Sequence, residues 1–327
     1  MGVGIQDQKK QSLKTQKLFH LPRQQATSRG IRLPRGEGRK IRRRWVIKSG
    51  SSLVCAGGPL LIRGWMKQVL GLRKKYGIEV IWVTSGAIAS AVARTGFRKK
   101  NRKISEKQAL SAIGQPLVMD LYNLALHAEG LMGAQVLLTY DDLVNPKRLG
   151  HFKTTLEQLL HWGAVPILNE NDVVSNDEIQ FGDNDSLSAK VAFHARAERL
   201  LILTDVHGLY DDDPKTHENA QLLHDLHEVS DELLGRMPQQ AGSSSGTGGM
   251  FSKLRAAREA SENGVETWLV KGDLPEVLGQ VAEGLQVGTR VRAQFKKRNP
   301  AGLPRGWKKK EKLLVSSRPR KSVEVLP

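Results

Sequence analysis

The chain has 327 residues, of which 39% are hydrophobic, and it holds a single cysteine, Cys55. This length suits one large α/β domain or two smaller ones, with room for a sizeable core. No run of 18 uncharged apolar residues occurs, so we expect no transmembrane helix. One cysteine excludes an intramolecular disulfide and a cysteine-rich zinc site, and it fits a reducing, cytoplasmic setting.

The net charge of +18 is concentrated at the two ends of the chain. Residues 1–44 contain 13 Lys/Arg and 2 Asp/Glu, and residues 291–327 contain 12 Lys/Arg and 2 Asp/Glu. Between them, residues 45–290 contain 26 Lys/Arg and 29 Asp/Glu, so this part carries a small negative charge. We interpret residues 1–44 as a disordered basic extension, residues 45–290 as the folded domain and residues 291–327 as a basic tail. A mitochondrial presequence, or contact of these ends with nucleic acid, is the less favoured interpretation.

The folded part alternates short apolar runs with helical patterns. Runs typical of strands occupy residues 44–48, 78–85, 134–138, 164–169, 199–204 and 266–270. Patterns typical of helices occupy residues 58–76 and 105–127, fill the gaps between the strands 134–138, 164–169 and 199–204, start near Gly248, and follow residues 272–277. This alternation predicts βαβ units and a mostly parallel sheet with both faces covered. Ligands of such sheets bind at the carboxyl ends of the strands.

The first two predicted strands end in small polar residues. Lys48 precedes Ser49 and Gly50, an arrangement that places a cation beside exposed backbone N–H groups and suits a phosphate. Ser85 precedes a glycine where the second strand meets a helix, which suits a carboxylate or a phosphate. A plain turn and a plain helix N-cap would look the same, so each signal alone is weak.

The most unusual stretch follows the predicted strand 164–169. It is dense in Asp, Glu and Asn from Asn169 onward, and it ends in "DND", Asp183 to Asp185, directly before an apolar helical pattern. Carboxylates that enter a core need a cation, an ammonium group or protein lysines as partners. The cluster therefore predicts a binding site rather than a solvated loop.

Two further segments complete this pattern. Thr204 and Asp205 end the strand 199–204, where a nucleotide would lie, and the glycine-rich run "SGTGGMFSKLRAA" places Lys253 in the first turn of a helix. Two lysines, glycine-rich junctions and one carboxylate cluster predict phosphoryl transfer from a nucleotide. The P-loop type is excluded, because the dipeptide Gly-Lys of that motif does not occur in the chain.

Six motifs occur in the order and spacing typical of the glutamate 5-kinases: "VIKSGSSLV", "VTSGAIASA", "KQALSAIGQ", "VPILNENDVVSNDEIQFGDNDSLSAKVA", "LLILTDVHGLYDDDP" and "GTGGMFSKLRAA". Over about residues 45–290, the chain thus resembles these members of the amino acid kinase family. The resemblance implies a three-layer αβα sandwich with a mostly parallel central sheet. It also implies ATP- and Mg²⁺-dependent phosphorylation of the γ-carboxylate of L-glutamate. The product, L-glutamyl 5-phosphate, begins proline biosynthesis.

The resemblance further implies roles for individual residues. Lys48 and Lys253 would act in catalysis at the phosphates of ATP, and Asp185 would orient both lysines. The residues implied for glutamate binding are Ser85, Asn169, Asp172, Asp183 and Asn184. The residues implied for ATP binding are Lys48, Gly50, Thr204, Asp205, Thr247, Gly248, Gly249, Met250, Phe251, Ser252 and Lys253. No metal ligand is assigned.

The same resemblance implies feedback inhibition by L-proline, a separate glutamyl phosphate reductase downstream, and a homo-oligomer. The chain departs from the family at position 49, where Ser49 replaces a usually apolar residue and would loosen the first strand slightly. The chain also ends too early for the C-terminal PUA module that many members carry, so we expect that module to be absent.

Two alternatives stay open at the level of the sequence. A relative such as an acetylglutamate kinase would phosphorylate a different acid, but its substrate has no free ammonium group to match the dense acidic loop. A regulatory or nucleic-acid-associated protein that has lost catalysis would use the basic ends. Against that hypothesis, Lys48, Asp185 and Lys253 are all present.

Overall fold

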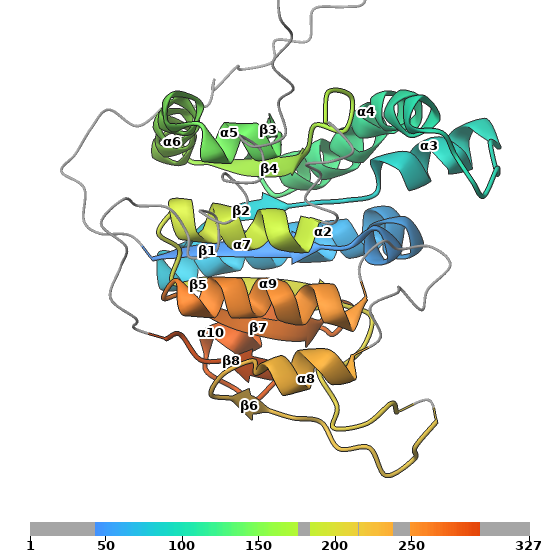
Figure 1. Cartoon of the computed structure of the whole chain (residues 1–327). Coiled ribbons are helices and arrows are strands. Elements are labelled where there is room, and N and C mark those ends of the chain that lie inside the picture. The colour runs from blue at the N-terminus through green and yellow to red at the C-terminus, as the bar shows by residue number, and fades with distance from the viewer. Residues whose placement is uncertain (1–42, 176–183, 215, 238–248, 295–327) are drawn as a thin grey trace, which may run out of the picture. The chain divides into compact units, whose positions relative to one another are not determined.

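The computed structural model of the chain describes residues 43–175, 184–214, 216–237 and 249–294. Most of both basic ends therefore lies outside the described residues, as do Asp183, Thr247 and Gly248 of the predicted site. The strands are β1 (Arg44–Ser49), β2 (Glu79–Val83), β3 (Met132–Leu138), β4 (Ala164–Glu170), β5 (Arg199–Thr204), β6 (Asp225–Leu226), β7 (Glu266–Lys271) and β8 (Thr289–Val291). The helices are α2 (Ser51–Tyr76), α3 (Ala87–Thr95), α4 (Ile104–Ala128), α5 (Tyr140–Val144), α6 (Pro146–His161), α7 (Asn184–His194), α8 (Asp231–Arg236), α9 (Met250–Glu262) and α10 (Val277–Ala282) (Figure 1).

The strands form one sheet in the order β3-β4-β2-β1-β5-β7-β8-β6. All its pairings are parallel except that of β7 with β8, so the carboxyl ends of β1, β2, β4, β5 and β7 meet at one edge. The chain first adds strands on one side of β1 and then, from β5 onward, on the other side. Ligands of open α/β sheets bind at such a reversal, which here lies beside the end of β1.

Helices cover both faces of the sheet (Figure 1). Buried side chains of α2, α4 and α10 pack on the face that carries Trp45, Ile47 and Trp82. Those of α6, α7 and α9 pack on the opposite face, against Val46 and Ile81. This arrangement follows from the alternation of side chains along a strand, because successive residues point to opposite faces. The predicted three-layer sandwich with a mostly parallel sheet is confirmed.

Two glycines allow the tight approach of helices at the edge where β2 ends. Gly86 precedes α3 with a φ of 105°, a conformation that a residue with a side chain rarely adopts. Gly114 of α4 lies against the first residue of α3, and a Cβ there would fall 1.7 Å from the carbonyl oxygen of Ala87. The two glycines thus bring α3 and α4 close to the residues that follow β2.

The structure differs from the predicted elements in several places. Helix α2 begins at Ser51, seven residues before the predicted start at Gly58, and Gly58 with a φ of 53° marks a kink inside it. The short elements α5, α8, β6 and β8 were not predicted, because so few residues carry no readable period. Among the described helices, none is long and apolar enough to cross a membrane.

Candidate active site

The centre of the site is the carboxylate of Asp185, which lies between two lysines. Its Oδ1 lies 2.5 Å from Nζ of Lys48 at the end of β1, and its Oδ2 lies 3.5 Å from Nζ of Lys253 in the first turn of α9. The hydroxyl of Ser252 donates to the same Oδ2 at 2.8 Å. Three elements that are distant in sequence thus meet at one carboxylate.

This carboxylate is fully buried, which decides its electrostatics. Burial by itself would raise the pKa of Asp185, but the charges of Lys48 and Lys253 and the hydrogen bonds outweigh it and lower the pKa to about 2. Asp185 is therefore ionised at neutral pH, and its charge offsets part of the charge of the two lysines. Lys48 is 4% exposed, so its ammonium group is held in a largely dry setting.

Asn184, at the start of α7, connects the ends of β2 and β4. Its Nδ2 lies 2.6 Å from the carbonyl oxygen of Thr84, 2.9 Å from Oγ of Ser85 and 2.6 Å from Oδ1 of Asn169. Three residues implied for glutamate binding, Ser85, Asn169 and Asn184, are thus brought together by direct hydrogen bonds. Asn184 also precedes Asp185, so this group lies directly beside the lysine cluster.

Helix α4 supplies two polar residues that the sequence analysis did not assign. Gln115 Oε1 accepts a hydrogen bond of 2.7 Å from Nδ2 of Asn169, and the hydroxyl of Ser111 donates at 2.7 Å to Asp172. Ser111 and Gln115 are four residues apart and share one face of the helix, a spacing that could have identified them within the motif "KQALSAIGQ". Burial raises the pKa of Asp172 above its usual range, and the bond from Ser111 opposes that rise.

On the other side of Asp185, the ends of β5 and β7 and the start of α9 form the predicted nucleotide region. Thr204 is buried at the end of β5, and its hydroxyl donates to the exposed Asp205 at 3.1 Å. Its carbonyl oxygen accepts from the backbone N–H of Gly272, which follows β7. Gly249 precedes α9, and its carbonyl oxygen lies 2.9 Å from the hydroxyl of Ser252, whose single proton it shares with Asp185.

The remaining predicted residues fall in the same region of the fold. Gly50 separates β1 from α2, and a Cβ at this position would lie 3.8 Å from Nζ of Lys48, so the glycine leaves space beside the ammonium group. Met250 and Phe251 form the first turn of α9 with Ser252 and are half-buried. The helices α2 and α9 both begin here, and their first backbone N–H groups favour an anion.

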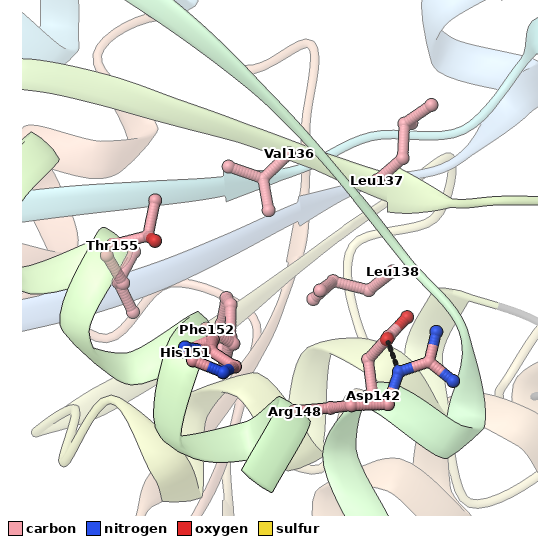
Figure 2. Close-up of a pocket in the computed structure, with 9 residues that line it drawn as sticks. Val136, Leu137, Leu138, Asp142, Arg148, His151, Phe152 and Thr155 are labelled. Atoms are coloured by element: carbon pink, nitrogen blue, oxygen red, sulfur yellow. Dashed lines mark ion pairs between the residues drawn. The ribbon is translucent and has the colours of Figure 1, made fainter.

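A separate hollow of about 340 Å³ lies beside the edge strand β3 (Figure 2). Its walls include Val136 and Leu138 of β3 and Phe152 of α6, and an ion pair of 2.7 Å joins Arg148 to Asp142 at its rim. None of the predicted site residues that the structure describes lines this hollow. The predicted site therefore belongs to the region around Asp185 and not to this hollow.

Residues 43–271 match the model of a family described as "Amino acid kinase family". A protein of Thioalkalivibrio sulfidiphilus named "Glutamate 5-kinase" is 42% identical over 251 residues, which cover 76% of this chain and 66% of the relative. A protein of Nitrosococcus oceani with the same name is 40% identical over 272 residues, which cover 82% of this chain and 71% of the relative. The chain thus spans about two thirds of the length of these curated relatives.

A solved structure shows the same fold at a much lower level of sequence identity. X-ray structures of isopentenyl phosphate kinase superpose with a TM-score of 0.55, and the match covers 76% of this chain and 99% of that chain. The identity is 17%, so this likeness supports the arrangement of helices and strands alone.

Proposed function

The chain belongs to the amino acid kinase family, and we propose that it transfers the γ-phosphoryl group of ATP to the γ-carboxylate of L-glutamate. The curated relatives are named glutamate 5-kinase, and identity of about 40% over most of the chain supports the same reaction here. The match to the family model confirms the family predicted from the sequence, and the names of the relatives support the kinase class. The product would be L-glutamyl 5-phosphate, the first intermediate of proline biosynthesis.

The observation that carries this proposal is the buried carboxylate of Asp185 between Lys48 and Lys253. A glutamate γ-carboxylate is ionised at neutral pH and is already a nucleophile, so the reaction needs no general base. What it needs is alignment of the two substrates and neutralisation of the charge on the phosphoryl group in flight. Two lysines held in place by one carboxylate supply that positive charge without reorganisation.

The glutamate would bind between the ends of β2 and β4. Asp172 suits the α-ammonium group, because a carboxylate is the natural partner of a buried cation. The hydroxyl of Ser85 and the first backbone N–H groups of α3 suit the α-carboxylate, since a helix N-terminus favours an anion. Asn169 and Asn184 would hold these groups in place through the hydrogen bonds between them.

ATP would bind across the ends of β5 and β7 and the start of α9. Thr204 and Asp205 would face the nucleotide, and the backbone from Gly249 to Lys253 would surround the phosphates. Mg²⁺ would enter with ATP, because this ion is commonly held by substrate phosphates together with one or two carboxylates. In the part of the chain that the structure describes, no group of three or more His, Cys, Asp or Glu residues could hold it alone.

Three partners belong to the same proposal. L-proline carries the α-ammonium and α-carboxylate groups of glutamate, so it would compete at the same pocket as a feedback inhibitor. A separate reductase would consume the acyl phosphate product, and the kinase would act as a homo-oligomer. Titration of proline at low and at high glutamate tests the first point: inhibition should weaken as glutamate rises, and no effect at millimolar proline would contradict it.

The decisive experiment is a comparison of acceptors with the purified chain. ADP release and trapping of the acyl phosphate as a hydroxamate would be measured with L-glutamate, L-aspartate and N-acetylglutamate at equal concentrations. We expect both signals with glutamate only, because the other two acids change the chain length or remove the ammonium charge. A preference for N-acetylglutamate would contradict the proposal. The variant Lys253→Ala, purified in parallel, serves as the control for contaminating kinases.

A further inference from the structure

A buried polar cluster lies on the face of the sheet opposite Asp185. It consists of four side chains, all 0% exposed, which we call the Tyr122 cluster: Ser49, Trp82, Thr84 and Tyr122. The first three come from the ends of β1 and β2, and Tyr122 comes from α4, which packs on this face. Polar groups are costly in such a core unless they bond to each other.

The hydrogen bonds of the cluster meet at the Tyr122 hydroxyl. It accepts from Nε1 of Trp82 at 2.9 Å and from the hydroxyl of Thr84 at 3.0 Å, and it lies 3.0 Å from Oγ of Ser49. A phenol has one proton and two lone pairs. The single N–H of Trp82 is shared between this hydroxyl and Oγ of Ser49, which lies 3.0 Å from Nε1, and either hydroxyl of the Ser49–Tyr122 pair can donate to the other.

Burial raises the pKa of Tyr122, which keeps the phenol protonated and able to donate. Ser49 completes the group as the hydrogen-bonding partner of both Tyr122 and Trp82. From the sequence we expected Ser49 to loosen the first strand slightly. The structure shows instead that its hydroxyl joins β1 to β2 and to α4, and an apolar residue at this position would remove a partner of both Trp82 and Tyr122.

The cluster is connected to the candidate active site through the backbone. Ser49 directly follows Lys48, and the alternation of side chains sends Lys48 to the α7 face and Ser49 to the α4 face. Thr84 stands in the same relation to Ser85, and its carbonyl oxygen accepts the hydrogen bond from Asn184. The single proton of the Thr84 hydroxyl lies within reach of both the Tyr122 hydroxyl at 3.0 Å and the carbonyl oxygen of Ser85 at 3.2 Å. Each strand end thus carries a functional residue next to a member of the cluster.

The register of β1 against β2 places the cluster and the functional residues side by side. Lys48 pairs with Val83 across β1 and β2, so the next residues, Ser49 and Thr84, follow side by side at the ends of the two strands. Tyr122 bonds to both from α4. A shift of β1 along β2 would break these bonds, and it would carry the ammonium group of Lys48 away from Ser85 and Asn184.

We propose that the Tyr122 cluster is a positioning device that sets the end of β1, and with it Lys48, relative to the glutamate pocket at the end of β2. This inference rests on the proposed kinase reaction. The four residues touch neither substrate in the proposed arrangement and act through Lys48, Ser85 and Asn184. A misplacement of about 1 Å at a reacting group can lower turnover by up to about 10²-fold, so small movements of β1 are enough to matter.

The test compares two substitutions of equal shape, Ser49→Thr and Ser49→Val. Both add the same branch in the core, and only the threonine keeps the hydroxyl. We expect Ser49→Thr to retain most of the turnover and Ser49→Val to lower kcat about tenfold relative to it, with the KM for ATP changed less than about twofold. Equal kcat values for the two variants would overturn the proposal.

Tyr122→Phe, which removes only the phenol oxygen, provides the second measurement. The kcat of Tyr122→Phe should fall to a similar extent as that of Ser49→Val. The kcat of the double variant Ser49→Val/Tyr122→Phe should be no lower than that of the more affected single variant, because the two hydroxyls form one unit. If the fold reduction in kcat of the double variant equalled the product of the two single reductions, the two residues would act independently, and this would contradict the proposal. Without glutamate-dependent turnover by the unaltered chain, the proposed function would fail instead, before any variant is compared.

Ser261→Ala is the matched control for general destabilisation. Ser261 is 2% exposed near the carboxyl end of α9, and its hydroxyl donates to the carbonyl oxygen of Arg292 at 2.6 Å. This variant also removes one buried hydroxyl, so its melting temperature should fall, while kcat measured well below the melting temperature stays within about twofold. If Ser261→Ala lowered kcat as much as Ser49→Val, the effect of the cluster would be one of stability alone, and the proposal would be wrong.

Discussion

The two sides of the candidate site are built in different ways. The glutamate side, at the ends of β2 and β4, is joined by bonds between side chains that are distant in sequence: Asn184 to Asn169 at 2.6 Å, and Asn169 to Gln115 at 2.7 Å. On the nucleotide side, at the ends of β5 and β7 and the start of α9, the side-chain bonds between its own described residues are local, and the bond between distant residues is one of backbone, from the N–H of Gly272 to the carbonyl oxygen of Thr204. There Thr204 bonds to its neighbour Asp205, and Ser252 bonds to the nearby Gly249.

This difference matches the two ligands that we propose. An amino acid offers few atoms, so its charged groups must be met by side chains that are already fixed in direction. A polyphosphate can be held by backbone N–H groups at helix starts, which need no side-chain scaffold. Asp185 belongs to both sides, because it follows Asn184 in the chain and pairs with Lys253 of α9. Substitutions should therefore separate into those that damage both sides and those that damage one.

The largest effect is expected from the lysines that meet at Asp185. Lys48→Ala and Lys253→Ala should each lower kcat by about 10² or more, because each removes a charge aimed at the phosphoryl group in flight. Steady-state kinetics with both substrates saturating measures this. Lys75→Ala is the control, since Lys75 forms an exposed ion pair with Glu283. Near-normal turnover in either variant would remove that lysine from the mechanism.

The next effect should be confined to the glutamate side. Asp172→Ala and Asn184→Ala are expected to raise the KM for glutamate about tenfold or more and to leave the KM for ATP within about twofold, because their side chains suit an amino acid rather than a polyphosphate. Varying each substrate at saturation of the other gives both constants. An equal loss for ATP would show that these residues belong to the other substrate.

The converse effect, a smaller rise in the KM for ATP alone, is expected on the nucleotide side. Thr204→Val keeps the shape of the buried side chain and removes its hydrogen bond to Asp205. We expect the KM for ATP to rise about threefold to tenfold while the KM for glutamate stays unchanged, because the loss of one hydrogen bond typically costs about 0.5–1.5 kcal/mol. A change in the KM for glutamate alone would reverse our assignment of the two sides.

The smallest effect on turnover is expected at the far end of α7, the helix that both sides share. Burial, with the charges of Lys153 and Lys190, lowers the pKa of His194 from 6.5 to about 3. Between these values the unfolded chain takes up a proton that the folded chain does not, so stability should fall as the pH drops from about 6.5 towards 3. Below about 4 the lowered pKa of Asp185 adds to that loss.

The variant His194→Gln tests whether His194 governs the pH dependence of stability while contributing little to turnover. The variant cannot bind that proton, so its stability should depend less on pH than that of the unaltered chain between pH 7 and pH 5. Chemical denaturation at the two values measures the difference, and kcat at pH 7 should stay within about twofold. An unchanged pH dependence would show that His194 is already protonated in the folded chain or is not buried in solution.

Much of the arrangement was contained in local patterns of the sequence. The alternation of apolar runs with helical segments predicted the parallel sheet, because strands and helices have different periods. Lys48, Ser85, Thr204 and Lys253 were found because they stand where a strand ends or a helix begins. The parallel sheet then gathers such ends at one edge, so residues that look unrelated in the chain meet in space.

The tertiary structure alone decided which side chains bond to which. The pairing of Asn169 with Gln115 and of Ser49 with Tyr122 joins residues 54 and 73 positions apart. Such pairs depend on the order of strands in the sheet and on which helix covers which face, and a local period contains neither. The same limit explains why Ser49 looked like a defect in its strand. Its partners come from β2 and α4, and only the folded core brings them within 3.0 Å of its hydroxyl.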